Sequence, residues 1–211
     1  MTTRVKICGL STAETMQVAL DAGADFVGLM FYPKSPRNVS LEQAATLATQ
    51  ARGRAKIVAV VVDADDALLK SIMNYAKPDY IQAHGSETPQ RIEEIRNQTG
   101  ARVIKVIKVN DAGDVALAKD YRDVADLIMF DPKAPEDALP GGNGLSFDRN
   151  LLKGKDGQFM LAGGLNPENV AEAIRQTRAP IVDVSSGVET TPGKKDISLI
   201  RKFIEAAKAA R

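Results

Sequence analysis

Four polar side chains in this sequence combine the chemistry of proton transfer or anion binding with positions near short apolar runs. Cys8 and His84 are the only cysteine and the only histidine of the chain. Asp131 closes the apolar run Leu127–Phe130, and Arg37 lies in a loop that two prolines stiffen. A thiol, carboxyl or imidazole group can transfer a proton in catalysis, and a guanidinium matches a carboxylate or a phosphate. These residue types indicate acid–base chemistry on an anionic ligand.

Each of the four residues also has an ordinary structural explanation. A free cysteine is commonly a small buried hydrophobic residue, and an aspartate after a strand commonly starts a turn or caps a helix. A buried histidine can be hydrogen-bonded by its neighbours, and a loop arginine is usually solvated. Position at the end of a strand favours function for Cys8. Both interpretations stay open for Asp131, His84 and Arg37.

Strand alternation predicts which of these side chains face the same way. Cys8 lies two residues after Lys6, so both side chains share one face of a strand. The Lys6 ammonium could lower the pKa of the thiol, which would suit a base or a nucleophile, and the sequence leaves open whether it does. His84 shares a face with Gln82 in the same way. Asp126 precedes its strand rather than ending it, and we interpret it as structural.

Two glycine-containing turns indicate a phosphate site. Gly163 and Gly164 follow one β-rich run, and Ser186 and Gly187 follow the next. Glycines allow the backbone to approach an anion, and exposed amides supply donors. Either turn alone is commonplace, but the pair falls at the seventh and eighth strands, where parallel barrels commonly bind phosphate.

The elements that must position these residues alternate eight times. The predicted strands are Val5–Cys8, Phe26–Phe31, Lys56–Val62, Tyr80–His84, Val103–Val109, Leu127–Asp131, Phe159–Gly163 and Ile181–Ser185. The predicted helices are Thr12–Ala22, Leu41–Arg52, Asp65–Ala76, Pro89–Thr99, Ala112–Asp120, Phe147–Leu152, Pro167–Gln176 and Ile197–Ala209. The candidate helix caps are Ser40, Asn166, Asp196, Gly23, Gly53 and Gly100.

Eight strand–helix units predict an α/β fold, a single (βα)8 TIM barrel with outer helices. An open doubly wound sheet, with its usual five or six strands, fits this number of units less well. We expect one catalytic domain over residues 1–211. In such a barrel the active site lies at the carboxyl ends of the strands. The long connections Tyr32–Ser40 and Pro132–Ser146 are then candidates for loops that cover the substrate.

Composition narrows the function classes. The chain of 211 residues has 44% hydrophobic residues, and its 28 Lys and Arg against 27 Asp and Glu give a net charge of +1. We expect no nucleic-acid or membrane partner on this balance, and a cytoplasmic location from the single cysteine and the absence of a signal or spanning segment. One histidine and one cysteine form no metal-ligand cluster of known spacing, so we expect neither a zinc site nor a redox site.

The motifs taken together resemble phosphoribosylanthranilate isomerase of tryptophan biosynthesis over essentially the whole chain. The resemblance rests on Lys6–Leu10, Asp25–Leu29, Pro33–Arg37, Ile81–Gly85, Phe130–Asp131, Gly141–Gly144, Leu161–Asn169, Asp183–Glu189 and Gly193–Asp196. It implies an aldose–ketose isomerase that converts N-(5-phosphoribosyl)anthranilate to 1-(2-carboxyphenylamino)-1-deoxyribulose 5-phosphate by an Amadori rearrangement. It also implies no cofactor and no metal.

The resemblance also assigns roles by motif. Asp131 is then the general acid that opens the sugar, and Cys8 is the general base that removes the C2 proton. Arg37 holds the anthranilate carboxylate and His84 lines the same pocket. The phosphate lies on backbone amides around Gly163, Gly164, Ser186 and Gly187.

Two other functions compete with this one. The same barrel and phosphate site suit another sugar-phosphate isomerase or lyase, and a related aminoaldose isomerase of histidine biosynthesis is expected to have an aspartate where Cys8 stands. A non-catalytic protein that binds a phosphorylated aromatic metabolite is the third possibility. The sequence leaves the assembly state as a monomer or a homodimer.

Overall fold

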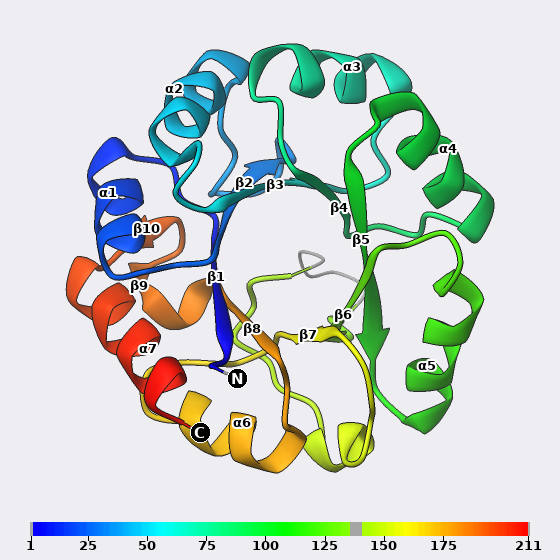
Figure 1. Ribbon diagram of the computed structural model, residues 1–211, viewed down its shortest axis with the longest axis vertical. Coiled ribbons are helices and arrows are strands. Elements are labelled where there is room, and N and C mark those ends of the chain that lie inside the picture. Colours follow the sequence, from blue (N-terminus) through cyan, green and yellow to red (C-terminus); the bar gives the residue numbers. More distant parts are fainter. Residues whose placement is uncertain (1, 136–140, 211) are drawn as a thin grey trace.

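The computed structural model describes residues 2–135 and 141–210, in which eight parallel strands close into a barrel surrounded by helices (Figure 1). The strands are β1 (Arg4–Cys8), β2 (Phe26–Phe31), β3 (Lys56–Val61), β4 (Tyr80–Ala83), β5 (Arg102–Val109), β6 (Leu127–Pro132), β7 (Phe159–Leu161) and β8 (Ile181–Val184). They pair in chain order, and β8 pairs back to β1. The predicted fold class is therefore confirmed.

The outer layer consists of α-helices with short 3-10 helices among them. The α-helices are α1 (Ala13–Asp21), α2 (Leu41–Ala51), α3 (Asp66–Tyr75), α4 (Pro89–Thr99), α5 (Ala112–Ala116), α6 (Val170–Thr177) and α7 (Ile197–Ala209). The 3-10 helices are η1 (Leu117–Tyr121), η2 (Arg149–Leu152) and η3 (Ser186–Val188). Because helices cover the outside of the all-parallel sheet, its strands are buried on both faces.

Two helix predictions differ from the structure. The helix expected at Phe147–Leu152 is wrong, because Asp148 caps a short 3-10 turn and Gly154, at φ +75°, ends the segment two residues after it. The helix expected at Ala112–Asp120 changes after Ala116 into the 3-10 helix η1, at whose end the Tyr121 hydroxyl donates to the Glu87 carbonyl at 3.0 Å. Both exceptions follow strands of the second half of the barrel.

Most of the predicted caps are confirmed. Ser40 forms a capping box with Gln43, and Asp196 accepts from two amides of the first turn of α7. Gly100 ends α4 in the left-handed conformation. Asn166 is not the N-cap of α6, because its side chain accepts from the amides of Glu168 and Asn169 in the turn before the helix.

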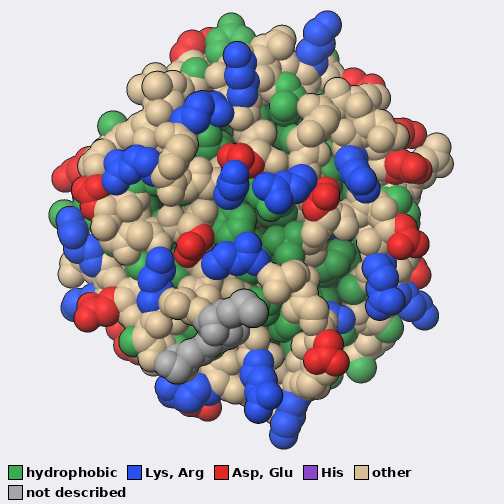
Figure 2. Space-filling model, in the orientation of Figure 1, with side chains coloured by type: hydrophobic (Ala, Val, Ile, Leu, Met, Phe, Trp, Pro, Cys, Tyr) green, Lys and Arg blue, Asp and Glu red, His purple; other side chains and the backbone are tan. Residues whose placement is uncertain are grey.

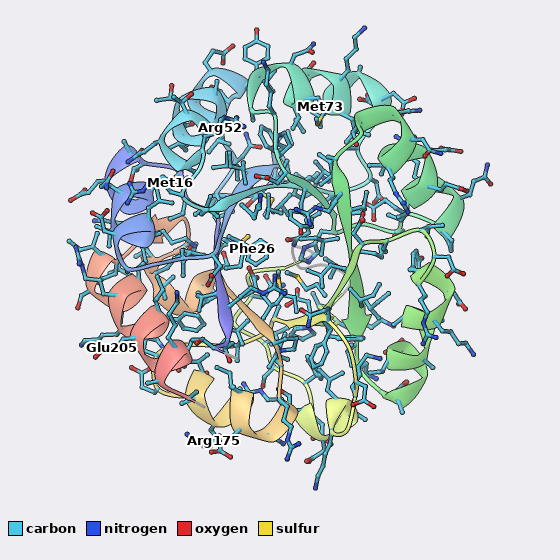
Figure 3. The ribbon with its side chains drawn as sticks, viewed as in Figure 1. Met16, Phe26, Arg52, Met73, Arg175 and Glu205 are labelled. Atoms are coloured by element: carbon cyan, nitrogen blue, oxygen red, sulfur yellow. The ribbon has the colours of Figure 1, made fainter. Side chains whose placement is uncertain are left out.

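Alternation along the strands separates two apolar layers. Val5 and Ile7 of β1 belong to the layer between the barrel and the helices, whereas Cys8 belongs to the layer inside the barrel. In Figure 3, Phe26 lies within the ring of strands, and Arg175 and Glu205 lie on the outside of α6 and α7. The predicted orientation of Cys8 is therefore confirmed.

At the amino ends of the strands, three aspartates tie neighbouring strands together. Asp25, Asp79 and Asp126 each precede an even-numbered strand, and each accepts the amide of the second residue of the odd-numbered strand before it at 2.8–2.9 Å. The structural interpretation of Asp126 is confirmed by this contact.

The face in Figure 2 interleaves basic and acidic side chains, so no single sign of charge dominates it.

The carboxyl ends of the strands bear the longer connections. Residues 32–40 join β2 to α2, and of the expected loop Pro132–Ser146 the residues 136–140 lie outside the described part of the chain. A small antiparallel hairpin, β9 (Glu189–Thr191) and β10 (Lys194–Lys195), follows β8. Strand prediction missed this hairpin, although Pro192-Gly193 is a common turn sequence.

Candidate active site

A cavity opens at the carboxyl ends of the strands. It lies where the barrel topology predicts chemistry. All eight predicted site residues line it: Cys8, Arg37, His84, Asp131, Gly163, Gly164, Ser186 and Gly187. These residues come from β1, the loop after β2, and the ends of β4, β6, β7 and β8. The fold therefore brings the whole predicted set to one place.

Cys8 lies in the cavity wall beside a buried ion pair. The Lys6 side chain is fully buried, and its Nζ donates to Asp183 Oδ1 of β8 at 2.7 Å. Burial raises the pKa of the Cys8 thiol, and the opposing effect of Lys6 does not overcome it. Burial alone would lower the pKa of Lys6, but Asp183 and Cys8 raise it. The question left open by the sequence is therefore answered against a lowered thiol pKa, because desolvation outweighs the neighbouring cation.

Gly28 of β2 makes room for this group. It pairs with Cys8 across the β1–β2 ladder. A Cβ at this position would lie 2.9 Å from Cys8 Sγ and 3.3 Å from Lys6 Nζ. A larger residue would therefore displace the thiol or the ammonium group. Sequence analysis did not single out Gly28, since its partner strand is known only once the register is known.

Asp131 is joined to the only histidine of the chain. Asp131 Oδ2 lies 3.2 Å from His84 Nε2, and Gln82 Nε2 lies 3.1 Å from His84 Nδ1. An amide NH2 can only donate, so Nδ1 accepts and Nε2 carries the proton donated to Asp131. The Gln82 Oε1 atom is buried without a hydrogen-bond partner among the described residues. Asp131, His84 and Gln82 therefore form one polar chain.

A second buried ion pair holds the turn after His84. Lys105 Nζ donates to Glu87 Oε2 at 2.7 Å and to the Gly85 carbonyl at 3.0 Å. Glu87 Oε1 accepts from the amides of Gly85 and Asp63. Burial alone would raise the pKa of Glu87, but Lys105 and these amides lower it below its ordinary value. The backbone that follows His84 is thus fixed from behind the barrel wall.

Arg37 is buried rather than solvated, with 3% of its surface exposed. Its Nε and Nη2 donate to the two carboxylate oxygens of Glu189 at 2.8 Å each. Its side chain passes close to Gly9, where a Cβ would lie 2.6 Å from Arg37 Cδ. The positive φ of Gly9, +75°, also favours glycine at that position. Arg37 therefore reaches the cavity through a space that only glycine leaves open.

The two glycine turns pack tightly against the backbone of other loops. Gly163 and Gly164 have φ values of +93° and +59°. A Cβ on Gly164 would lie 2.9 Å from the Leu145 carbonyl oxygen, and one on Gly187 would overlap the carbonyl of Leu165. These positions require glycine because no side chain fits. The turns thereby present main chain rather than side chains to the cavity.

Residues that could hold other groups are few in the part of the chain that the structure describes. No three His, Cys, Asp or Glu side chains there are placed to hold a metal ion. No helix among the described residues is long and apolar enough to cross a membrane. The polar groups of the cavity are instead suited to proton transfer and to binding anions.

Comparison with known proteins agrees with this geometry. Residues 5–206 match the family model of N-(5'-phosphoribosyl)anthranilate (PRA) isomerase. The chain belongs to that family. An N-(5'-phosphoribosyl)anthranilate isomerase from Rhodopseudomonas palustris is 51% identical, with all of both chains covered.

Two solved structures extend the match from sequence to coordinates. A phosphoribosyl anthranilate isomerase in complex with reduced 1-(o-carboxyphenylamino)-1-deoxyribulose 5-phosphate has a TM-score of 0.85 at 35% identity over 98% of each chain. Monomers generated from the dimeric Thermotoga maritima phosphoribosylanthranilate isomerase give a TM-score of 0.84 at 35% identity, again over 98% of each chain. As a member of this family, the chain is an isomerase of tryptophan biosynthesis.

Three charged residues near the cavity were missed as site residues by sequence reasoning: Asp183, Glu189 and Lys195. Asp183 lines the cavity, and the other two lie behind Arg37. For Asp183 a signal existed, because an aspartate in the apolar run Ile181–Val184 shares the inward face with Ile181. For Glu189 no local signal exists, since Arg37 lies 152 residues away in sequence.

Proposed function

We propose that Asp131 and Cys8 carry out the Amadori rearrangement of N-(5-phosphoribosyl)anthranilate, the reaction of the family. The observation that supports these roles is that a carboxyl group and a thiol line one cavity together with Arg37 and two glycine turns. Asp131 donates a proton to the furanose ring oxygen, and the ring opens to a Schiff base. Cys8 then removes the C2 proton, and the resulting enolamine tautomerises to the ketone product.

His84 lines the substrate pocket and also contacts the acid. Its Nε2–H contact at 3.2 Å orients the Asp131 carboxyl group toward the cavity. Burial raises the pKa of the Cys8 thiol, so Cys8 acts as a base only after its proton has been released to water through the open cavity. The thiolate then takes up the C2 proton. Lys6, the nearest cation, stabilises the thiolate that forms.

Arg37 and the glycine turns anchor the two acidic ends of the substrate. The guanidinium binds the anthranilate carboxylate, and the backbone amides around Gly163, Gly164, Ser186 and Gly187 bind the phosphate. A related isomerase was solved with a reduced, phosphorylated, carboxyphenyl product analogue, which supports both anchors. No cofactor or metal takes part in this proposal.

The substrate is thus a small phosphorylated aminosugar, and we propose a cytoplasmic location with neither nucleic acid nor membrane as partner. The net charge of +1 supports the absence of polyanionic partners. The dimeric form of the Thermotoga maritima relative supports a homodimer, with a monomer as the alternative. The comparisons support this activity over another sugar-phosphate isomerase, a lyase or a non-catalytic binding protein.

The decisive experiment follows the fluorescence of phosphoribosylanthranilate formed in the cuvette. We expect wild-type protein to accelerate its decay, and Cys8→Ala and Asp131→Asn each to lower kcat by at least about a hundredfold, as acid–base groups typically contribute. Glu205→Gln, an exposed change on α7, is the matched control and keeps the wild-type rate. Wild-type protein that leaves the decay unchanged would refute the activity. Unchanged kcat in both variants would refute the roles alone.

A further inference from the structure

The hairpin β9–β10 places two charged side chains directly behind Arg37. Glu189 and Lys195 are cross-strand partners, and the register shifts between Lys194 and Lys195. After this shift Lys194 is exposed, whereas Lys195 is buried. Lys195 Nζ lies 2.6 Å from Glu189 Oε1. The hairpin therefore presents an ion pair toward the barrel rather than toward solvent.

Four donors surround the Glu189 carboxylate. Oε1 accepts from Arg37 Nε and Lys195 Nζ, and Oε2 accepts from Arg37 Nη2 and the Gly193 amide. Burial alone would raise the pKa of Glu189, but Arg37 and Lys195 lower it below its ordinary value. Glu189 is therefore ionised at neutral pH and has little freedom to rotate.

This pairing decides which edge of Arg37 is available to a ligand. Nε and Nη2 face Glu189, and Nη2 also donates to the Gly142 carbonyl at 3.2 Å. Among the described residues, no hydrogen-bond acceptor is placed at Nη1. At Gly142 a Cβ would lie 2.5 Å from Nη1, so a side chain at this position would occupy the space next to that atom. A planar guanidinium held along one edge can turn its other edge in one direction only.

The charges of the cluster leave it attractive to an anion. Arg37 and Lys195 are two cations against the single carboxylate of Glu189, so one net positive charge remains. Lys195 Nζ also donates to the Ser185 carbonyl at 3.0 Å. Ser185 directly precedes the turn at Ser186 and Gly187. The hairpin thus anchors Glu189 to the barrel end without cancelling the positive charge.

We propose that Glu189 is a positioning residue, which fixes the Arg37 guanidinium so that its Nη1 edge receives the carboxylate of the substrate. The inference rests on the proposed function, because it takes the carboxylate contact of Arg37 from there. It assigns a role to the motif Gly193–Asp196, which holds Glu189 in place from the second strand of the hairpin. Glu189 itself need not touch the ligand.

The test compares two ligands that differ only in the carboxyl group. The first is reduced 1-(2-carboxyphenylamino)-1-deoxyribulose 5-phosphate, and the second is the same compound with a plain phenyl ring. Titration calorimetry should show that Glu189→Gln weakens binding of the first at least about tenfold, the size expected for one misaligned charge-assisted contact. The affinity for the second should change by less than about twofold, because its phosphate contacts persist.

The outcomes separate positioning from simpler explanations. If Glu189 only offset the positive charge of Arg37, removing the negative charge of Glu189 would tighten binding of the carboxylate ligand. If the hairpin were merely structural, both ligands would weaken equally. Either result overturns the proposal. Lys194→Met and Glu205→Gln, both exposed, are the matched controls and should leave both affinities unchanged.

A second comparison tests whether Glu189 acts through Arg37. Arg37→Ala removes the group through which Glu189 acts, so adding Glu189→Gln to Arg37→Ala should leave the affinity for the carboxylate ligand unchanged. A further loss in the double variant overturns the proposal. Failure of the proposed function is distinguishable, because wild-type protein would then bind neither ligand.

Discussion

The two ends of the barrel use the same residue types in opposite ways. At the amino end, Lys56 pairs with Asp79, and their side chains are 51% and 29% exposed. Inside the barrel, beside the cavity at the carboxyl end, Lys6 pairs with Asp183, and their side chains are 0% and 10% exposed. Water screens the charges of the first pair, whereas each buried charge of the second pair is stabilised mainly by the other. Solvent exposure therefore decides how much the loss of one partner of an ion pair lowers the stability of the barrel.

The backbone differs between the ends as well. The aspartates at the amino end accept strand amides and so act as extensions of the sheet. The glycines at the carboxyl end adopt positive φ angles and leave space for Arg37 and for other loops. One end thus maximises internal hydrogen bonding, while the other end keeps donors and space for a ligand. This division matches the separation of stability and activity in barrels of this type.

The largest expected effect tests the comparison of the two lysines. Lys6→Met should lower the free energy of unfolding by about 3–5 kcal/mol, because Asp183 becomes a buried charge without a partner. Lys56→Met should change it by less than about 1 kcal/mol, as for exposed pairs. Urea unfolding followed by circular dichroism measures both. Equal losses in the two variants would mean that burial does not distinguish the two ends.

A smaller effect concerns the ion pair behind His84. Glu87→Gln should cost about 1.5–3 kcal/mol at pH 7, the range for hydrogen bonds to charged groups. Because the pKa of Glu87 is lowered on folding, its carboxylate stabilises the fold above its ordinary pKa, and this stabilisation is lost as the pH falls toward the folded value. Urea unfolding should therefore show the difference between wild type and Glu87→Gln shrinking below about pH 4.5.

The control for that measurement is Glu93→Gln, an exposed substitution on α4, the helix that follows Glu87 in the chain. It should alter the free energy of unfolding by less than about 0.5 kcal/mol at any pH, as for ordinary surface substitutions. A wild-type to Glu87→Gln difference that stays constant with pH would show that the charge of Glu87 is not what matters.

The smallest effect compares the aspartates at the two ends of β6, Asp126 and Asp131. Asp126 directly precedes β6 and accepts the Val103 amide, whereas Asp131 lies near the carboxyl end of β6 and lines the cavity. Asp126→Ala should destabilise the protein by about 1 kcal/mol, the typical value of one hydrogen bond, and leave kcat within about twofold. Thermal melts and the fluorescence assay measure both quantities. A large loss of kcat in Asp126→Ala would break the separation of the two ends.

Much of the fold was predictable because its signals are local. The apolar runs that became β2 and β5, and the cap at Ser40, depend on residues within a few positions of each other. The segment at Phe147–Leu152 failed because its short apolar pattern fits both a 3-10 turn and a helix.

The site was predictable only in part, for the same reason. The positions of Cys8 and Asp131 follow from strand ends, which the sequence shows directly. The partner of Arg37 and the space beside Gly28 depend on contacts between distant segments. The pKa direction of Cys8 depends on burial, which a neighbouring lysine in the sequence does not reveal.

The closure of the barrel between β1 and β8 has a consequence for synthesis on the ribosome. The wall beside Cys8 includes Asp183, paired with Lys6 across 177 residues of sequence. During synthesis Cys8 is therefore translated early, and its thiol is enclosed only after β8 has been made. Contacts of such long sequence separation form late in folding. A nascent chain stalled before β8 should thus carry a thiol open to oxidants, which the closed barrel shields.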